Sequence, residues 1–440
     1  MRKLKLFIKK VTKENSFISN LFFIFLGIFR LIINNLISLK FKAVKFLGIS
    51  SLKSLNISII GPIHSAHLQS FIKSFNNRYE KKYKIRFQLI NSDPNSIVND
   101  FKYNNQIIDK GIYYLLGYRS DYNLWIENIF LYAKNNLKDF TGKYLIKKII
   151  KFKPDIIWIH DLQSAGYLTE NDLPRFKMEL PNLKICATVW GNDLYHFYEL
   201  DSHFKMLSSI LKNVNFLHAE SNRDELIARK LGFKGVMLPV CSVALKNIEV
   251  FFDINKLNNI EIKKDIYILI KGSYYLRSNM MYFHDQLIAN PDFWIGKKIV
   301  ILGASNDDIF YFSKLKNKIN LDIEIYSSVP HETFISFLRR SIYHLSCNLS
   351  DGIPNTAPEA VFSNCLPLFT NHTGLAELLP LKLRNIIVFD LPTVNFLSLF
   401  NELDSNKLSR FEILNDLKFY FELKIFNDNI YNDFYNLLEV

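Results

Sequence analysis

Short apolar runs of four to six residues recur along this chain from Leu55 onward, and segments long enough for helices separate them. Runs of this length that are apolar throughout are typical of parallel strands buried on both faces of a sheet. The runs fall into two sets, which comprise 56–60, 155–159, 184–189 and 215–219, and then 266–270, 298–302, 323–326, 343–346 and 366–369. Each set predicts one doubly wound parallel-sheet domain, so we expect an α/β chain with two Rossmann-like domains that face a cleft.

The length of the chain also indicates more than one domain, because 440 residues exceed the usual size of a single α/β domain. We place the boundary in the polar, charged segment 247–264, which separates an N-terminal domain over 54–246 from a C-terminal domain over 265–410. The segment 411–440 is rich in Phe and Tyr, and we expect its helices to pack across the domain junction. Residues 1–53 form a separate basic, apolar extension.

The positive charge of the chain is concentrated in this extension. The net charge is +13, and residues 1–53 contain eleven Lys or Arg against the single acid Glu14, which leaves +10 there and only +3 elsewhere. A nucleic-acid enzyme is expected to carry its basic patch around its folded cleft, so the distribution argues against nucleic acid as a partner. A basic terminal segment indicates the anionic lipid of a membrane surface instead.

Within the extension, the apolar segment 17–39 is nearly long enough to span a bilayer, but Asn20, Arg30, Asn34 and Asn35 interrupt it. An arginine at the centre of a spanning helix costs about 2.5 to 3.5 kcal/mol. A secretory signal is a poor fit as well, because no small-residue cleavage site follows. We therefore expect a helix that lies in the interface at the cytoplasmic face of the membrane, so that the protein is peripheral. A helix packed on the N-terminal domain and a spanning helix are the alternatives.

The four cysteines suggest neither a disulfide framework nor a zinc site. They are scattered, with no Cys-x-x-Cys pair and no suitable His spacing, at Cys186, Cys241, Cys347 and Cys365. We expect reduced thiols in a cytoplasmic protein and no bound metal.

Two turns in the segment 350–378 are the most informative part of the chain. In each, a strand ends and a helix is expected to begin, with Asp351 and Gly352 in the first turn and Gly374 in the second. Helix starts supply free N–H groups and the positive end of a dipole, which suit a diphosphate. Ligands of doubly wound sheets also bind at the carboxyl ends of the strands.

This segment resembles the donor-binding signature of glycosyltransferase family 4, and the resemblance extends from about Leu55 to Leu379. An acidic pair separated by seven residues is typical of that family, and Asp351 and Glu359 keep this spacing, with Asp in place of the commoner Glu. The resemblance implies that Glu359 accepts hydrogen bonds from the two ribose hydroxyls of a nucleotide sugar, which suit the two oxygens of a carboxylate. It places Asp351 beside the donor sugar, near the reacting face.

The same register makes other residues candidates for donor binding, namely Gly272, Gly352, Asn355, Thr356, Gly374 and Glu377. Gly61, in the first strand-to-helix turn, would allow a phosphate to approach the backbone. A structural alternative exists for both acids. Thr356 and Glu359 also fit a capping box, and Glu377 fits a first-turn carboxylate on its own helix.

Blocks over 153–161, 188–193 and 219–223 resemble the family in the same order along the chain. They make His160, at a strand end, and Asp193, in the glycine turn after the next strand, candidates for catalysis alongside Asp351. A further catalytic candidate is His64, close to His67 in the turn after Gly61; its alternative is a solvated loop histidine.

The chain departs from the family at two positions. Trp190 stands where many members carry a histidine that contacts the reacting sugar, and Ser273 stands where the diphosphate-binding arginine is expected. Arg277 or Lys271 could neutralise the diphosphate instead, because the leaving group gains negative charge as the glycosidic bond breaks.

The resemblance implies a GT-B fold and a retaining, metal-independent transfer, with no cofactor other than a nucleotide-diphosphate sugar as co-substrate. The absence of an Asp-x-Asp motif agrees with metal independence. We expect a lipid-linked or polysaccharide acceptor at the membrane, as in lipopolysaccharide synthesis. A nucleotide-sugar epimerase and a catalytically weak GT-B assembly protein are the alternative functions.

Overall fold

The computed structural model describes residues 53–62, 65–79, 83–92, 107–109, 146–191, 193–242, 262–272, 279–391, 393–405 and 407–422. Several predictions lie outside these residues, namely the helix over 17–39, most of the linker over 247–264, and the roles of His64, Ser273 and Arg277. No helix in the described ranges combines the length and the apolar character needed to cross a bilayer.

The first domain contains a seven-stranded parallel sheet in the order β3-β2-β1-β4-β5-β6-β7. Its strands are β1 (Lys53–Gly61), β2 (Tyr83–Asn91), β3 (Ile107–Asp109), β4 (Ile156–His160), β5 (Lys184–Thr188), β6 (Phe216–His218) and β7 (Val236–Met237). The order reverses between β1 and β4, which is the topological switch point of a doubly wound sheet. The helical elements are α3 (Ala66–Tyr79), η3 (Asp161–Gly166), α5 (Tyr167–Thr169), α6 (Leu173–Glu179), α7 (Asp201–Leu211) and α8 (Asn222–Lys230).

The core of this domain lies on both faces of the sheet, because side chains alternate between the faces along a strand. In β1, Ile57 and Ile59 pack with Phe71 of α3 on one face. Ile60 joins the core on the opposite face, together with Ile159 of β4. This two-sided burial is why the strands of the domain are apolar runs.

The second domain contains a six-stranded parallel sheet in the order β10-β9-β8-β11-β12-β13. Its strands are β8 (Ile266–Lys271), β9 (Ile299–Leu302), β10 (Ile323–Tyr326), β11 (Ser341–Ser346), β12 (Leu366–Thr370) and β13 (Val388–Phe389). The helices are α10 (Met280–Ala289), α11 (Pro291–Trp294), α12 (Asn306–Ile319), α13 (His331–Arg340), α14 (Thr356–Phe362), α15 (Gly374–Leu378), α16 (Leu381–Ile387), α17 (Phe396–Ser405) and α18 (Lys407–Tyr420).

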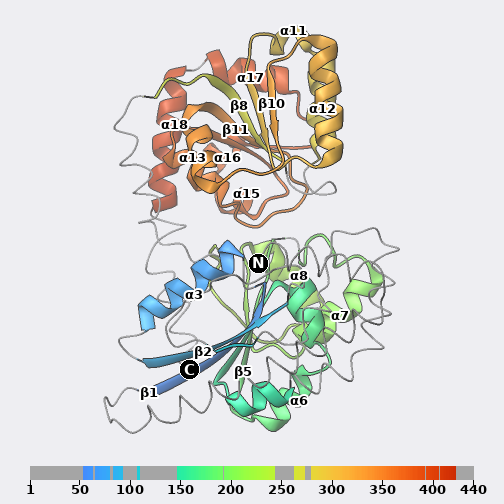
Figure 1. Cartoon of the computed structure of the whole chain (residues 1–440), viewed down its shortest axis with the longest axis vertical. Coiled ribbons are helices and arrows are strands. Elements are labelled where there is room, and N and C mark those ends of the chain that lie inside the picture. Colours follow the sequence, from blue (N-terminus) through green and yellow to red (C-terminus); the bar gives the residue numbers. More distant parts are fainter. Residues whose placement is uncertain are drawn as a thin grey trace, which may run out of the picture.

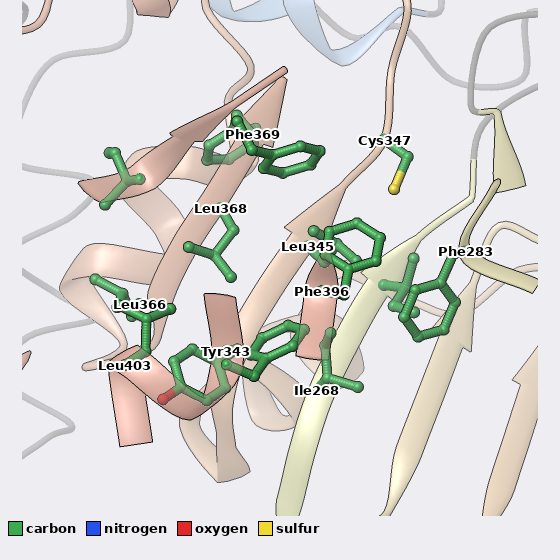
Figure 2. Close-up of a cluster of buried hydrophobic side chains, with 14 of the residues drawn as sticks. Ile268, Phe283, Tyr343, Leu345, Cys347, Leu366, Leu368, Phe369, Phe396 and Leu403 are labelled. Carbon is green, nitrogen blue, oxygen red and sulfur yellow. The ribbon is translucent and has the colours of Figure 1, made fainter. Parts of the chain in front are cut away.

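One face of this second sheet carries the largest hydrophobic cluster. Figure 2 shows Tyr343 and Leu345 of β11 beside Ile268 of β8, with Phe396 of α17 packed against them. Leu417 of α18 belongs to the same cluster. The described part of the segment 411–440 therefore packs on the C-terminal domain, whereas we expected it to pack across the junction.

The two sheets occupy separate halves of the molecule, and α15 of one half lies against α8 of the other (Figure 1). The residues that follow β5, β6, β11 and β12 meet at this junction. The carboxyl ends of strands from both domains thus face each other, which is the arrangement expected for a cleft between two doubly wound domains.

Candidate active site at the domain junction

Loops from the two domains are in direct hydrogen-bond contact at the junction. The Ser350 hydroxyl, after β11, donates to the carbonyl of Gly191, after β5, over 3.2 Å. The backbone N–H of Ile353 donates to the carboxylate of Glu220, after β6, also over 3.2 Å. The loop that carries Asp351 is therefore held from the N-terminal domain on both sides of that residue.

Three glycines allow the backbones of the two domains to approach each other. A Cβ atom on Gly352 would lie 2.0 Å from Glu220 Oε2, and one on Gly374 would lie 2.8 Å from Ser221 Cβ. Gly191 has a φ of +25°, and its Cβ would lie 2.3 Å from Gly352 N. Since no side chain fits there, contact between the domains explains these glycines. Donor binding by Gly352 and Gly374 stays a prediction.

Asp351 is half-buried at the centre of this contact. Its Oδ2 accepts a hydrogen bond from Asn348 Nδ2 over 3.1 Å, and its Oδ1 accepts from Gly352 N over 3.0 Å. Its carbonyl accepts from Gly374 N over 3.0 Å and from Arg223 Nη2 over 2.6 Å. Both the carboxylate and the backbone of Asp351 therefore have fixed positions.

Glu359 lies one helical turn into α14, is 4% exposed, and pairs with His331 Nε2 through its Oε1 over 3.0 Å. The His331 side chain is 62% exposed. The capping-box alternative is wrong, because Asn355 is the N-cap residue, Thr356 lies inside the helix, and the buried Thr356 hydroxyl has no hydrogen-bond partner among the described residues. The Glu359 carboxylate is therefore turned toward a surface histidine rather than toward the helix start.

Lys271 and Glu359 both act on the buried imidazole of His344. Burial, followed by the positive charge of Lys271, lowers the pKa of His344 to about 4, whereas the Leu269 carbonyl and the Glu359 carboxylate act in the opposite direction. A carbonyl only accepts, so the Nδ1 that bonds Leu269 O over 3.2 Å carries the proton. The predicted donor-binding residues Lys271 of β8 and Glu359 of α14 are thus both close to the neutral His344.

Asn355, four residues after Asp351, links the two domains by hydrogen bonds to His67 and Ser242. Its Nδ2 donates to His67 Nδ1 over 2.9 Å, and its Oδ1 accepts from the Ser242 hydroxyl over 3.4 Å. The His67 ring also meets the edge of Trp190, with 5.6 Å between centroids. An imidazole therefore lies beside Trp190, at the position where the resemblance to family 4 predicts a histidine.

Two of the predicted catalytic residues lie inside the N-terminal domain. His160 is fully buried against Phe71 and Trp158, and burial, followed by nearby His218, holds its pKa well below the ordinary value. Asp193 is 2% exposed, and its Oδ2 accepts from the N–H groups of Leu162 and Trp190, each over 2.9 Å. His160 thus packs in the core and Asp193 holds the turn after β5, and the catalytic roles that we expected of them stay predictions.

Two predicted phosphate-binding glycines have structural neighbours that explain them. A Cβ atom on Gly61 would lie 2.9 Å from His160 Cβ. Gly272 lies against Gly303, whose carbonyl would be 3.1 Å from an added Cβ. A side chain at Gly61 would force a neighbour to shift, and one at Gly272 would be tightly packed, so packing between neighbouring strand ends favours both glycines. Phosphate binding by either glycine stays a prediction.

Glu377 contacts the opposite domain. Its Oε2 accepts from the N–H groups of Asn222 and Arg223, over 3.0 and 3.2 Å, and so satisfies the first turn of α8. Glu377 lies in the first turn of α15, as the structural alternative predicted, and its role in donor binding stays a prediction. The sequence does not indicate the contact with α8, because Glu377 lies 155 positions from Asn222.

Sequence reasoning also missed the role of Arg223, although it falls in the block 219–223. Its guanidinium donates to the carbonyls of Asp351 and His372 and lies 3.8 Å from the ring centroid of Tyr195. Among the described residues, no cluster of three or more His, Cys, Asp or Glu side chains could hold a metal ion.

No protein-family model matches this chain, and no curated protein sequence matches it. Solved structures do. Sucrose-phosphate synthase from Thermosynechococcus elongatus is 12% identical with a TM-score of 0.61, over 88% of this chain and 98% of that one. HepE from Anabaena, solved in complex with UDP-glucose, is 9% identical with a TM-score of 0.58, over 88% and 99%. The lipopolysaccharide outer core galactosyltransferase WaaB is 12% identical with a TM-score of 0.54, over 88% and 100%.

Likeness at this level of identity establishes the fold. The chain has the two-domain GT-B fold, which confirms the predicted fold class. Membership of glycosyltransferase family 4 remains a prediction.

Proposed function

We propose that this protein is a retaining, metal-independent glycosyltransferase that moves a sugar from a nucleotide-diphosphate sugar to an acceptor at the membrane surface. One observation carries the proposal. The loop after β11 and the first turn of α14 present two carboxylates, Asp351 at the junction of the two domains and Glu359 beside the exposed His331. In a GT-B fold the carboxyl ends of the strands are where a ligand is expected.

In this proposal, Glu359 binds the ribose of the donor. A carboxylate accepts from two neighbouring hydroxyls, and the nearby His331 supplies a further polar group at the same surface. Lys271, like Glu359, acts electrostatically on His344, and its positive charge could face the diphosphate. Arg277 is the second candidate for that task.

Asp351 lies at the reacting end of the donor in this proposal. The bond between the anomeric carbon and the diphosphate breaks with its electron pair on the diphosphate, which Lys271 stabilises. The acceptor oxygen attacks from the same face and forms the new glycosidic bond, and its proton passes to the departing phosphate oxygen. Contact between the domains would exclude water, which otherwise hydrolyses the donor.

A lipid-linked or polysaccharide acceptor is supported by location and by likeness. The extension over 1–53 carries a net charge of +10, which favours the anionic surface of a membrane. WaaB, whose fold this chain shares, is a lipopolysaccharide galactosyltransferase. We therefore infer a role in cell-surface glycan synthesis at the cytoplasmic face.

The proposal is tested first by ligand binding. Thermal unfolding of the full chain with UDP, GDP, ADP and dTDP should show stabilisation by one of them, because a ligand bound only by the folded state raises the unfolding temperature. The corresponding nucleotide sugar is then incubated with and without membrane lipid. Acceptor-dependent release of the nucleoside diphosphate supports the transferase, whereas a sugar epimer formed without acceptor supports the epimerase. Stabilisation by none of the four supports the assembly protein.

The Glu359→Ala variant tests the site. It removes hydrogen bonds to a charged group, worth about 1.5 to 3 kcal/mol each, so two lost bonds should lower kcat/KM at least about 100-fold. Glu332→Ala, an exposed carboxylate on neighbouring α13, is the matched control and should leave the rate unchanged. Full activity of Glu359→Ala contradicts the assignment of the site.

A further inference from the structure

We propose that Arg223 is a positioning residue through which the N-terminal domain sets the place of Asp351 in the opposite domain. The inference rests on the proposed function and adds a requirement to it, which is that the donor site of the C-terminal domain is complete only while the two domains touch. It assigns Arg223 no contact with the donor.

The Arg223 guanidinium bridges two loops of the C-terminal domain by hydrogen bonds. Nη2 donates to the Asp351 carbonyl over 2.6 Å, and Nη1 donates to the His372 carbonyl. These acceptors lie in different loops, one after β11 and one after β12. The planar fork of an arginine can hold two acceptors at once, whereas an ammonium group on a flexible chain does so poorly.

Arg223 is itself fixed by its neighbours. Its side chain is 14% exposed, and its guanidinium lies 3.8 Å from the ring centroid of Tyr195. The Tyr195 hydroxyl is hydrogen-bonded to His372 Nδ1 over 3.0 Å, so the aromatic support contacts the loop that the guanidinium holds. The Arg223 N–H is bound to Glu377 of the opposite domain, which fixes the start of α8. A preorganised group of this kind loses little entropy when it bridges two loops.

Asp351 depends on this bridge because its loop has little regular structure. Its only β-type pairing among the described residues is an isolated bridge to Thr373, in the second loop. Gly374 N and Arg223 Nη2 share the Asp351 carbonyl. Without Arg223 the His372 carbonyl loses its donor, and the two loops lose one of the groups that tie them to each other, beside the Gly374 N–H. A displacement of about 1 Å in a reacting group costs up to about 100-fold in rate.

The alternative is that Arg223 only stabilises the fold. The same helix offers a matched control, because Arg229 donates to the carbonyls of Phe233 and Gly235 and lies over the Phe233 ring, all within the N-terminal domain. Replacing either arginine removes a cation–π contact and two hydrogen bonds to carbonyls, and Arg229 also loses its bond to Glu225 in the same helix. Only Arg223 reaches the opposite domain.

The experiment compares Arg223→Ala, Arg223→Lys, Tyr195→Phe and Arg229→Ala in the full chain, with UDP-glucose as the first donor probe and total membrane lipid as acceptor. We expect kcat to fall about 10- to 100-fold in Arg223→Ala and less in Arg223→Lys. The KM for the donor should stay within about 3-fold, since Glu359 and Lys271 are untouched. Tyr195→Phe keeps the ring under the guanidinium and should lower kcat less than Arg223→Ala does. Arg229→Ala should keep kcat within about twofold.

Two outcomes overturn the inference while leaving the proposed function intact. One is an active wild type with kcat unchanged in both Arg223 variants, and the other is an equal loss of kcat in Arg229→Ala. A wild type that none of UDP, GDP, ADP and dTDP stabilises, or that is inactive with the nucleotide sugar of the one that does, overturns the proposed function and the inference together. If Arg223→Ala does not fold, Arg223→Lys, which keeps the charge and most of the side-chain length, decides by the same comparison.

Discussion

At the scale of single residues, the junction is built from groups whose partners belong to the other domain. The Asp351 and Glu359 pair and its spacing could be read from the sequence, because an acidic pair in a fixed register is a local pattern. Arg223 and Glu377 could not, because their partners are backbone carbonyl and N–H groups, which every residue possesses. His160 was placed at a strand end correctly, and Asp193 lies in the turn after β5, but the burial of both depends on how neighbouring strands pack.

Asp224 gives a prediction at this scale. It is fully buried beside Arg223, and burial, the largest cause, raises its pKa to about 6 against the opposing effects of Arg223 and the Ser221 hydroxyl. Since the folded state binds its proton more tightly than the unfolded state, stability is greatest below the ordinary pKa of 3.8 and falls as the pH rises through 6. The change corresponds to at most about 3 kcal/mol.

Asp224→Asn should remove this dependence. Urea unfolding of wild type and variant between pH 4 and 7 would measure it, and the wild type should lose stability relative to the variant as the pH rises. Parallel curves over this range contradict the prediction.

At the scale of elements, most strands could be predicted and their ends could not. The run 155–159 corresponds to β4, Ile156–His160, and 266–270 to β8, Ile266–Lys271. β2 was missed because apolar and polar residues alternate in it, with exposed Arg86 between partly buried Ile85 and buried Phe87, and so it does not form a continuous apolar run. β7 and β13 have two residues each, which is too short for any pattern.

The turn before α14 gives a prediction at this scale. Gly352→Ala places a Cβ atom where Glu220 Oε2 lies 2.0 Å away and Glu220 Cβ lies 2.8 Å away, so the loop or Glu220 must move. Transfer activity should fall at least about 10-fold, because Asp351 is the adjacent residue. The measurement is nucleoside diphosphate release under the conditions used for wild type.

A second glycine provides the control for that variant. Gly296 has a φ of +76° and no atom within 4 Å of an added Cβ. Gly296→Ala should cost about 1 kcal/mol of backbone strain and leave activity unchanged. Equal activity of the two variants would show that the junction tolerates a side chain at Gly352.

At the scale of the whole molecule, the two-domain architecture could be predicted because two sets of apolar runs each require their own buried sheet. The contact between the domains could not be predicted, since it depends on glycines and backbone groups rather than on a charged or apolar pattern. The extension over 1–53 is chemically unlike both domains, with a net charge of +10.

Deletion of residues 1–50 tests the role of that extension. Most of the basic residues are removed, each worth about 1 kcal/mol at an anionic surface, so the shortened protein should move from the membrane fraction to the soluble fraction. Its activity on a water-soluble acceptor should remain. A shortened protein that still sediments with membranes contradicts interfacial anchoring by this segment.

The capping of α8 by Glu377 makes two amide hydrogens sensitive to separation of the lobes. The N–H groups of Asn222 and Arg223 are shielded by a carboxylate that belongs to the other half of the molecule. When the halves part, those hydrogens meet solvent and exchange with deuterium. Their exchange rate therefore reports how often the two domains separate. A bound nucleotide sugar that holds the domains together should slow this exchange.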